Sequence, residues 1–117
     1  MLRVAVLAIG VAIAAPALSQ DEPEAVYAKF HRAGLAADYD AMLKYGTAAK
    51  ARERKEFLQV LARLLPRHYS VVEKIVEEGG TRALLRLRGA PEAVSGAITL
   101  VKEKGEWKVD EANWGER

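Results

Sequence analysis

The chain has 117 residues, enough for a single domain; half of them are hydrophobic and 29% are charged, which is typical of a packed globular protein. It contains no cysteine, which excludes disulfide bonds, thiolate nucleophiles and sulfur-ligated metal sites. The formal net charge of +2 is far below that of proteins that follow a phosphate backbone, so we expect no nucleic-acid partner.

Residues 1–19 have the pattern of a secretory signal peptide. Arg3 supplies a positive start, Val4 to Ala15 is apolar without a charge, and Ala17-Leu18-Ser19 offers small residues at the cleavage site. The apolar run is shorter than the roughly 20 residues of a membrane-spanning helix. We expect cleavage after Ser19, a mature domain at 20–117 and a bacterial periplasmic or secreted protein; the alternative is an uncleaved N-terminal anchor.

Helical periodicity predicts two helices at the start of the mature chain. The first spans Glu24 to Ala37, with Asp21 or Glu22 as its cap and Pro23 in its first turn. Proline suits that turn because a backbone N–H there would have no hydrogen-bond partner within the helix. The second spans Tyr39–Tyr45, with Asp38 as its cap.

A third helix is expected over Ala48 to Leu65, where Pro66 stops it. Its first half is a basic stretch, which the interleaved glutamates Glu53 and Glu56 mark as a solvated face; a patch for anionic lipid or an acidic partner is the alternative. Its second half carries a wide apolar stripe that we expect to be buried. The stripe consists of Phe57, Leu58, Val60, Leu61, Leu64 and Leu65.

The period then changes to that of β-strands. Tyr69 to Glu77 and Thr81 to Arg88 form one hairpin around a Gly-Gly turn, and Glu92 to Trp114 forms a second one, with its turn at Lys102 to Glu106. Helices followed by strands predict an α+β domain: three N-terminal helices packed on the concave face of a curved four-stranded antiparallel sheet.

Two motifs and this element order resemble the nuclear-transport-factor-2-like, or cystatin-like cone, superfamily. The motifs are LAADYDAML at Leu35 to Leu43, where Ala37 replaces the usual glycine, and GEWKVD at Gly105 to Asp110. The resemblance implies a cone in which the sheet wraps the first helix and leaves a pocket at its open end. Similar proteins include isomerases, dehydratases, cyclases and small-ligand binders, so the resemblance leaves the function open.

The expected lining of that pocket is Tyr27, Phe30, Tyr45, Trp107 and Glu111. An isomerase of this shape needs a carboxylate base and acidic hydrogen-bond donors in a dry pocket. Asp40 could serve as the base, and Tyr27, Tyr39 or Tyr69 as the donor. The position of Asp40 in the first turn of a helix is equally explained by the helix dipole.

The two histidines, His31 and His68, lack the spacing of metal ligands, so we expect neither a metal nor a cofactor. Trp107 is expected in the core, in phase with Val109. Trp114 lies seven residues further on and is therefore expected on the outer face or edge of the sheet.

An exposed tryptophan often marks an interface, which we expect to include Trp114 and the basic residues Arg86 and Arg88. Dimerisation through this face of the sheet is common in similar proteins, so the resemblance implies that a homodimer through the sheet is one possible assembly of this chain. The leading hypothesis is a non-enzymatic periplasmic binding or accessory module, with a small apolar ligand or an envelope protein as its partner. The alternative is a small isomerase- or cyclase-like enzyme that uses an Asp/Tyr pair.

Overall fold

The computed structural model describes residues 21–51, 55–91 and 93–116. The expected signal peptide at residues 1–19 and its cleavage site lie outside these described residues. Within them, no helix combines the length and the apolar character needed to cross a membrane.

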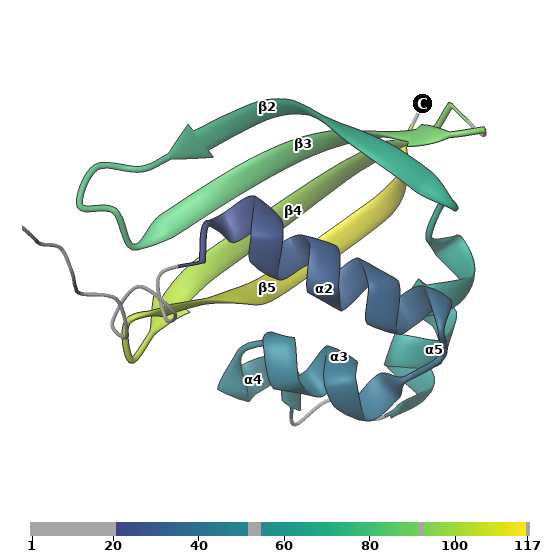
Figure 1. Ribbon diagram of the computed structural model, residues 1–117, viewed down its shortest axis with the longest axis horizontal. Coiled ribbons are helices and arrows are strands. Elements are labelled where there is room, and N and C mark those ends of the chain that lie inside the picture. Colours follow the sequence, from purple (N-terminus) through teal and green to yellow (C-terminus); the bar gives the residue numbers. More distant parts are fainter. Residues whose placement is uncertain (1–20, 52–54, 92, 117) are drawn as a thin grey trace, which may run out of the picture.

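The helices come first along the chain and the strands follow (Figure 1). The helical segments are α2 (Pro23–Leu35), α3 (Tyr39–Tyr45), α4 (Ala48–Ala51) and α5 (Lys55–Leu64). The strands are β2 (His68–Val76), β3 (Arg82–Ala90), β4 (Ser95–Glu103) and β5 (Glu106–Glu116). Neighbouring strands pair antiparallel in the order β2-β3-β4-β5. The expected α+β architecture, with helices packed against a four-stranded antiparallel sheet, is confirmed.

The sheet is curved, and α2 lies along its hollow side (Figure 1). On the other side of α2 from β2 lie α3 and α4, and α2 contacts α3, α5 and β5. A short parallel bridge between Gly46 and Val109 ties the end of α3 to β5. The helices therefore cover the β5 side of the sheet, and β2 forms the opposite edge.

The signals that we assigned to the first two helices act largely as expected. Pro23 is the first residue of α2, although the Glu22 side chain does not cap the helix and pairs instead with Lys74 of β2, at 2.8 Å. The bounds of α3 are those predicted. The Asp38 carboxylate accepts a hydrogen bond from a backbone N–H of the first turn of α3, at 3.2 Å.

The turn between α2 and α3 holds Ala37 in the left-handed backbone conformation, with φ of 58°. The Ala37 N–H donates to the carbonyl of Gly34 at 3.0 Å, and the Asp38 N–H donates to that of Ala33 at 2.9 Å. These bonds close the C-terminus of α2 in the manner usually built on glycine. For an L-residue with a Cβ this conformation costs roughly 1–2 kcal/mol.

The expected third helix corresponds to α4 and α5, on either side of residues 52–54, which are not described. The expectation that its whole apolar stripe is buried is wrong. Only one side of α5 faces the core, whereas the stripe is wider than that side. Leu58 and Leu65 are buried, Leu61 is partly buried, and Phe57, Val60 and Leu64 are exposed.

The core lies between the sheet and the helices. Tyr27 and Phe30 of α2 are fully buried, and Met42 of α3 joins them. The strands contribute Ala83, Leu85, Leu87, Ile98, Leu100, Trp107 and Val109. The expected alternation along β3 is confirmed, because its buried residues alternate with the exposed Arg86 and Arg88.

Trp114 was expected to be exposed on the outer face or edge of the sheet. It does lie on the edge strand β5, but the expected exposure is wrong, because the side chain is only 7% exposed. A β-bulge in β5 explains the difference: Leu100 pairs with Val109 and Thr99 pairs with Glu111, which leaves Asp110 as an extra residue. The extra residue reverses the alternation of faces beyond it. Trp114 therefore lies on the same inner face as Trp107.

The edge strand β2 exposes four aliphatic side chains, Val71, Val72, Ile75 and Val76. A β-bulge at Val72 interrupts its regular pairing. Lys74 pairs with Leu85 and so lies on the inner face, where its ammonium bonds to the Glu22 and Glu24 carboxylates at 2.8 and 3.0 Å. Bulges and inward-pointing lysines protect an edge strand from pairing with another chain.

Candidate functional site

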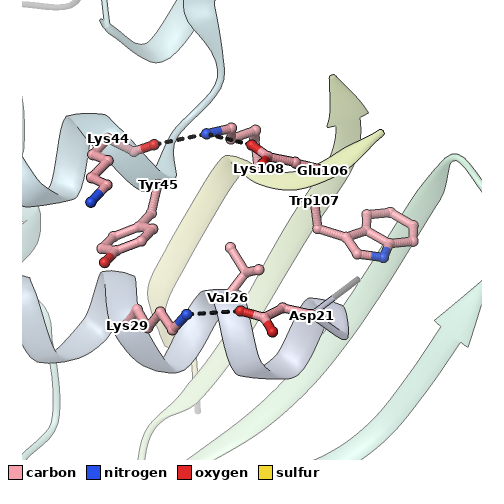
Figure 2. A pocket seen from close by; sticks show the side chains of 8 residues that line it. All are labelled: Asp21, Val26, Lys29, Lys44, Tyr45, Glu106, Trp107 and Lys108. Carbon is pink, nitrogen blue, oxygen red and sulfur yellow. Dashed lines mark hydrogen bonds and ion pairs between the residues drawn. The ribbon is translucent and has the colours of Figure 1, made fainter. Parts of the chain in front are cut away.

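A partly open pocket of about 240 Å³ lies between the first half of α2, the end of α3 and the start of β5 (Figure 2). Its lining residues are Asp21, Val26, Lys29, Lys44, Tyr45, Glu106, Trp107 and Lys108. The buried side chains of Val26 and Trp107 form its apolar part. Figure 2 shows Tyr45 pointing from α3 toward α2, with Val26 between Tyr45 and Trp107.

Backbone contacts hold these elements in place. Tyr45 is the last residue of α3, and Gly46 follows it as the C-cap. The Thr47 N–H then donates to the carbonyl of Val109 at 3.0 Å. The Thr47 hydroxyl donates to the carboxylate of the bulged residue Asp110, at 3.4 Å. The pocket wall formed by α3 is therefore fixed to the strand that carries Trp107.

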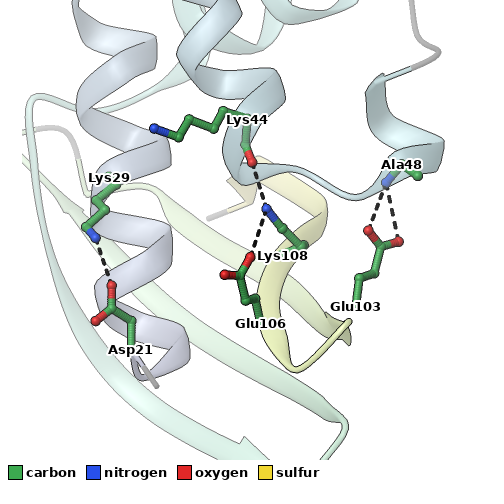
Figure 3. A network of polar contacts seen from close by, with 7 residues as sticks. All are labelled: Asp21, Lys29, Lys44, Ala48, Glu103, Glu106 and Lys108. Carbon is green, nitrogen blue, oxygen red and sulfur yellow. Dashed lines mark hydrogen bonds and ion pairs between the residues drawn. The ribbon is translucent and has the colours of Figure 1, made fainter. Parts of the chain in front are cut away.

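A polar network joins the β4–β5 hairpin to the helices near the pocket (Figure 3). The Lys108 ammonium donates to the Lys44 carbonyl at 3.0 Å and lies 3.6 Å from the Glu106 carboxylate. The Glu103 carboxylate accepts from the Ala48 N–H at 3.1 Å. These bonds use the carbonyl of Lys44 and leave its ammonium outside the network.

The charged groups at the pocket are three lysines and two carboxylates. Lys29 pairs with Asp21 at 2.8 Å, and this hydrogen bond raises the pKa of the Lys29 ammonium. The Lys44 ammonium lies 5.6 Å from the centre of the Tyr45 ring, and no carboxylate of the described residues is within ion-pair distance of it. The pocket thus combines an aromatic wall with one cation that has no carboxylate partner in the part of the chain that is described.

The expected pocket residues are only partly brought together. Tyr45 and Trp107 line the pocket. Tyr27 and Phe30 are fully buried in the core. Glu111 is exposed and pairs with Thr99 on the outer face, because the bulge that turns Trp114 inward also turns Glu111 outward.

The residues of the isomerase hypothesis are not assembled. The Asp40 side chain is 85% exposed and lies 3.7 Å from the Lys55 ammonium, so it is in water and not in the dry pocket that the hypothesis requires. Tyr27 is buried and uses its hydroxyl elsewhere. Tyr39 packs against the core.

The expected interface residues on β3 are exposed. Arg86 pairs with Glu73 of β2 at 3.1 Å, and both side chains are more than half exposed. Arg88 is also exposed. A pair in such contact with water contributes roughly 0–1 kcal/mol to stability. Trp114, the third expected interface residue, is in the core.

Sequence reasoning missed a buried hydrogen-bonded chain between α2 and β5. The Trp114 Nε1–H donates to the Tyr27 hydroxyl oxygen at 2.8 Å, and the Tyr27 oxygen lies 2.9 Å from His31 Nδ1. His31 Nε2 lies 2.8 Å from the carbonyl oxygen of Pro66. The spacing of four residues between Tyr27 and His31 was the available signal, because such residues share a helix face.

The donor at one end of this chain follows from the geometry. A carbonyl only accepts, so His31 donates its Nε2–H to Pro66. Burial lowers the pKa of His31 and so favours the neutral imidazole, whose Nδ1 then accepts from the Tyr27 hydroxyl. Burial also raises the pKa of the Tyr27 hydroxyl, which keeps the proton that it donates.

The described residues contain no group of three or more histidine, aspartate or glutamate side chains placed to hold a metal ion. A comparison of the chain with models of protein families, with curated proteins and with solved structures finds no match.

Proposed function

We propose that the protein is a non-enzymatic binding module whose pocket between α2, α3 and β5 holds a small molecule with an apolar, flat part and an anionic group. The observation that supports this most directly is the Lys44 ammonium, which has no carboxylate partner in the described chain and lies beside the Tyr45 ring. Trp107 and Val26 would contact the apolar part of the ligand. An anionic group would pair with Lys44.

The size of the pocket limits the ligand. Its volume of about 240 Å³ is below the roughly 300–1,000 Å³ of sites that hold drug-sized molecules. Tyr27 and Phe30 are fully buried and do not line this pocket, so the ligand would contact Val26, Tyr45 and Trp107 instead. The ligand that we infer is therefore a small aromatic or aliphatic carboxylate rather than a large lipid.

We also infer that the protein is a nuclear-transport-factor-2-like member and is exported to the bacterial periplasm. The helix-then-strand order and the left-handed backbone of Ala37, where similar proteins carry glycine, support the first inference. The pattern of residues 1–19 supports the second. A partner in the cell envelope is consistent with that location.

Amide-resolved NMR titration tests the binding proposal. Benzoate is the probe, and benzamide is its neutral counterpart of the same shape. We expect benzoate to shift the amides of Tyr45, Trp107 and Lys108, and benzamide to bind less tightly. Binding that saturates equally for both probes, or no shift at these amides at millimolar benzoate, would contradict the proposal.

Lys44→Gln is the informative variant, because it removes the ammonium and keeps the carbonyl that Lys108 uses. Loss of one charged contact at a solvent-accessible site should weaken benzoate binding by about fivefold. Arg88→Gln is the matched control, since it removes the same charge from the outer face of the sheet. Equal weakening by both variants would show that net charge, rather than the pocket, attracts the anion.

A further inference from the structure

The exposed side of α5 carries a ridge of large apolar side chains, Phe57, Val60 and Leu64, which are 60%, 52% and 51% exposed. Their spacings of three and four residues place them on one face of the helix. Leu58, on another side of the same helix, is buried and holds α5 to the core. The α5 ridge, defined as these three residues, is thus an apolar surface left without a partner in the described chain, and such surfaces mark contacts.

One flank of the α5 ridge carries a pair of opposite charges. Glu56 and Arg63 are seven residues apart, so they lie nearly above one another along the helix. Each immediately precedes a ridge residue, Glu56 before Phe57 and Arg63 before Leu64. The two pairs therefore have nearly the same centre. Phe57 and Leu64 lie three residues before and four after Val60, and Glu56 and Arg63 lie four before and three after it.

We propose that the α5 ridge is the contact of a two-fold symmetric dimer in which α5 packs antiparallel against α5 of a second copy. With Val60 at the axis, Phe57 of each copy meets Leu64 of the other. Antiparallel two-fold symmetry keeps the same flank of both helices on one side of the contact. Glu56 of each copy then faces Arg63 of the other, and two pairs of opposite charge form.

The charges select this arrangement and this partner. In a parallel two-fold pair the charged flanks lie on opposite sides of the contact and cannot meet. An anionic membrane surface would instead favour a ridge bordered by cations alone. Here a glutamate adjoins Phe57, and Lys55 is 3.7 Å from Asp40 of its own chain.

The contact is small, and this sets the strength that we expect. A helix of 10 residues is about 15 Å long, so the contact by itself is smaller than the roughly 1,200–2,000 Å² that stable complexes bury. The dimer is therefore weak and depends on concentration. It is also independent of the ligand pocket, whose lining includes no residue of α5.

Charge exchange is the decisive test. Sedimentation velocity of the purified protein from micromolar to millimolar concentration should show a monomer–dimer equilibrium. Glu56→Arg and Arg63→Glu each place two like-charge pairs in the contact and should weaken dimerisation by about tenfold or more. The double variant restores both pairs with their signs reversed and should regain most of the lost affinity. Glu56 and Arg63 also lie in the first and last turns of α5, where their charges favour the helix, so each variant should lower the unfolding midpoint slightly. The double variant loses both favourable placements and should still regain dimer affinity, which separates the contact from the stability of the helix.

A cysteine test fixes the position of the axis. The chain has no cysteine, so Val60→Cys introduces a single thiol beside its own symmetry mate. A disulfide needs Cα atoms roughly 4.4–6.8 Å apart, and mild oxidation should give a covalent dimer. Arg88→Cys, on the outer face of the sheet, is the control and should give no covalent dimer under the same oxidation.

The outcomes separate the proposal from its competitors. A protein that stays monomeric at millimolar concentration, or a double variant no better than the single ones, would overturn it. So would a dimer that crosslinks through Arg88→Cys and not through Val60→Cys, because that dimer uses the sheet. A third outcome is that the protein does not self-associate but sediments together with phosphatidylglycerol vesicles. If Val60→Asp abolishes that sedimentation, the α5 ridge binds a membrane instead of a second copy.

Discussion

Trp114 and Tyr27 are joined by a hydrogen bond of 2.8 Å between the indole N–H and the phenol oxygen, although 87 positions separate them in the sequence. The bond connects the last strand to the first helix. His31 and the Pro66 carbonyl extend it to the segment between α5 and β2. The four groups form one continuous chain of partners, so the loss of a middle member leaves two others unpaired.

Tyr27→Phe tests the energetic weight of this chain. The substitution keeps the ring and removes the hydroxyl, which leaves the Trp114 N–H and His31 Nδ1 buried without partners. We expect a loss of about 2–4 kcal/mol in the free energy of unfolding, measured by urea denaturation. Tyr69→Phe is the control, because the centre of the Tyr69 ring lies 4.6 Å from that of His31 and the residue is only half-buried. This variant should lower the free energy of unfolding by less than about 1 kcal/mol. Equal losses would show that the hydroxyl of Tyr27 is not special.

The pH dependence of stability should follow His31. Burial lowers the pKa of its imidazole in the folded protein, and the bond to the Pro66 carbonyl opposes this only in part. The unfolded chain has the ordinary pKa of about 6.5, so it binds more protons than the folded state as the pH falls below that value. This contribution to stability is present above pH about 6.5 and is lost as the pH falls through the folded pKa.

Two measurements check the histidine prediction. The free energy of unfolding should be lower at about pH 5 than at about pH 8. NMR titration of the His31 ring should give a midpoint below that of the same residue in the urea-unfolded protein, with the proton on Nε2 in the neutral form. A midpoint above the unfolded value would reverse the sign and contradict the assignment.

Ala37→Gly should stabilise the protein. Relief of the left-handed backbone strain at Ala37 outweighs the greater freedom of glycine in the unfolded chain, and the expected gain is about 0.5–1 kcal/mol. Ala36→Gly is the matched control, because Ala36 has φ of −89° and gains nothing from glycine. Thermal unfolding should rank Ala37→Gly above the original protein and Ala36→Gly at or below it. The reverse ranking would mean that the turn is not strained.

Gly96→Ala should be destabilising because the Trp114 ring lies over this glycine. A Cβ at position 96 would lie 2.7 Å from Cε3 of the indole, closer than side-chain carbons approach one another. We expect a loss of about 1–3 kcal/mol, since the ring is held at its N–H and cannot move aside. In a Trp114→Leu background the same substitution should cost less. An unchanged cost would place the clash elsewhere.

The local order of the chain could be predicted from its sequence, because the signals are short-range. Asp38 caps α3 as expected, and the alternation along β3 gives its buried face. The turn at Lys104 and Gly105 has positive φ at both residues, which a two-residue hairpin turn requires. Each of these features depends on a few neighbouring residues, so it can be predicted from the local sequence alone.

The errors arose where one residue alters everything after it or where a surface lacks a partner. The extra residue Asp110 reverses the faces of β5, so that Trp114 turns inward and Glu111 outward. Nothing in the alternation of that strand marks the bulge. The sequence predicts that the α5 ridge is buried, because periodicity shows which residues share a helix face and does not show what that face contacts. Tyr45 and Trp107 line the pocket because the end of α3 and the phase of the first half of β5 lie where the sequence predicts them.

The bond between Tyr27 and Trp114 also bears on the order in which the protein can fold. Each strand of the sheet pairs with the strand next to it in the sequence, so most of the sheet can form before the last residues of the chain have been synthesised. The Tyr27 hydroxyl receives its indole donor only from the final strand. Because α2 and β5 are the first and last elements of the described chain, this part of the core closes only after the whole domain has been made.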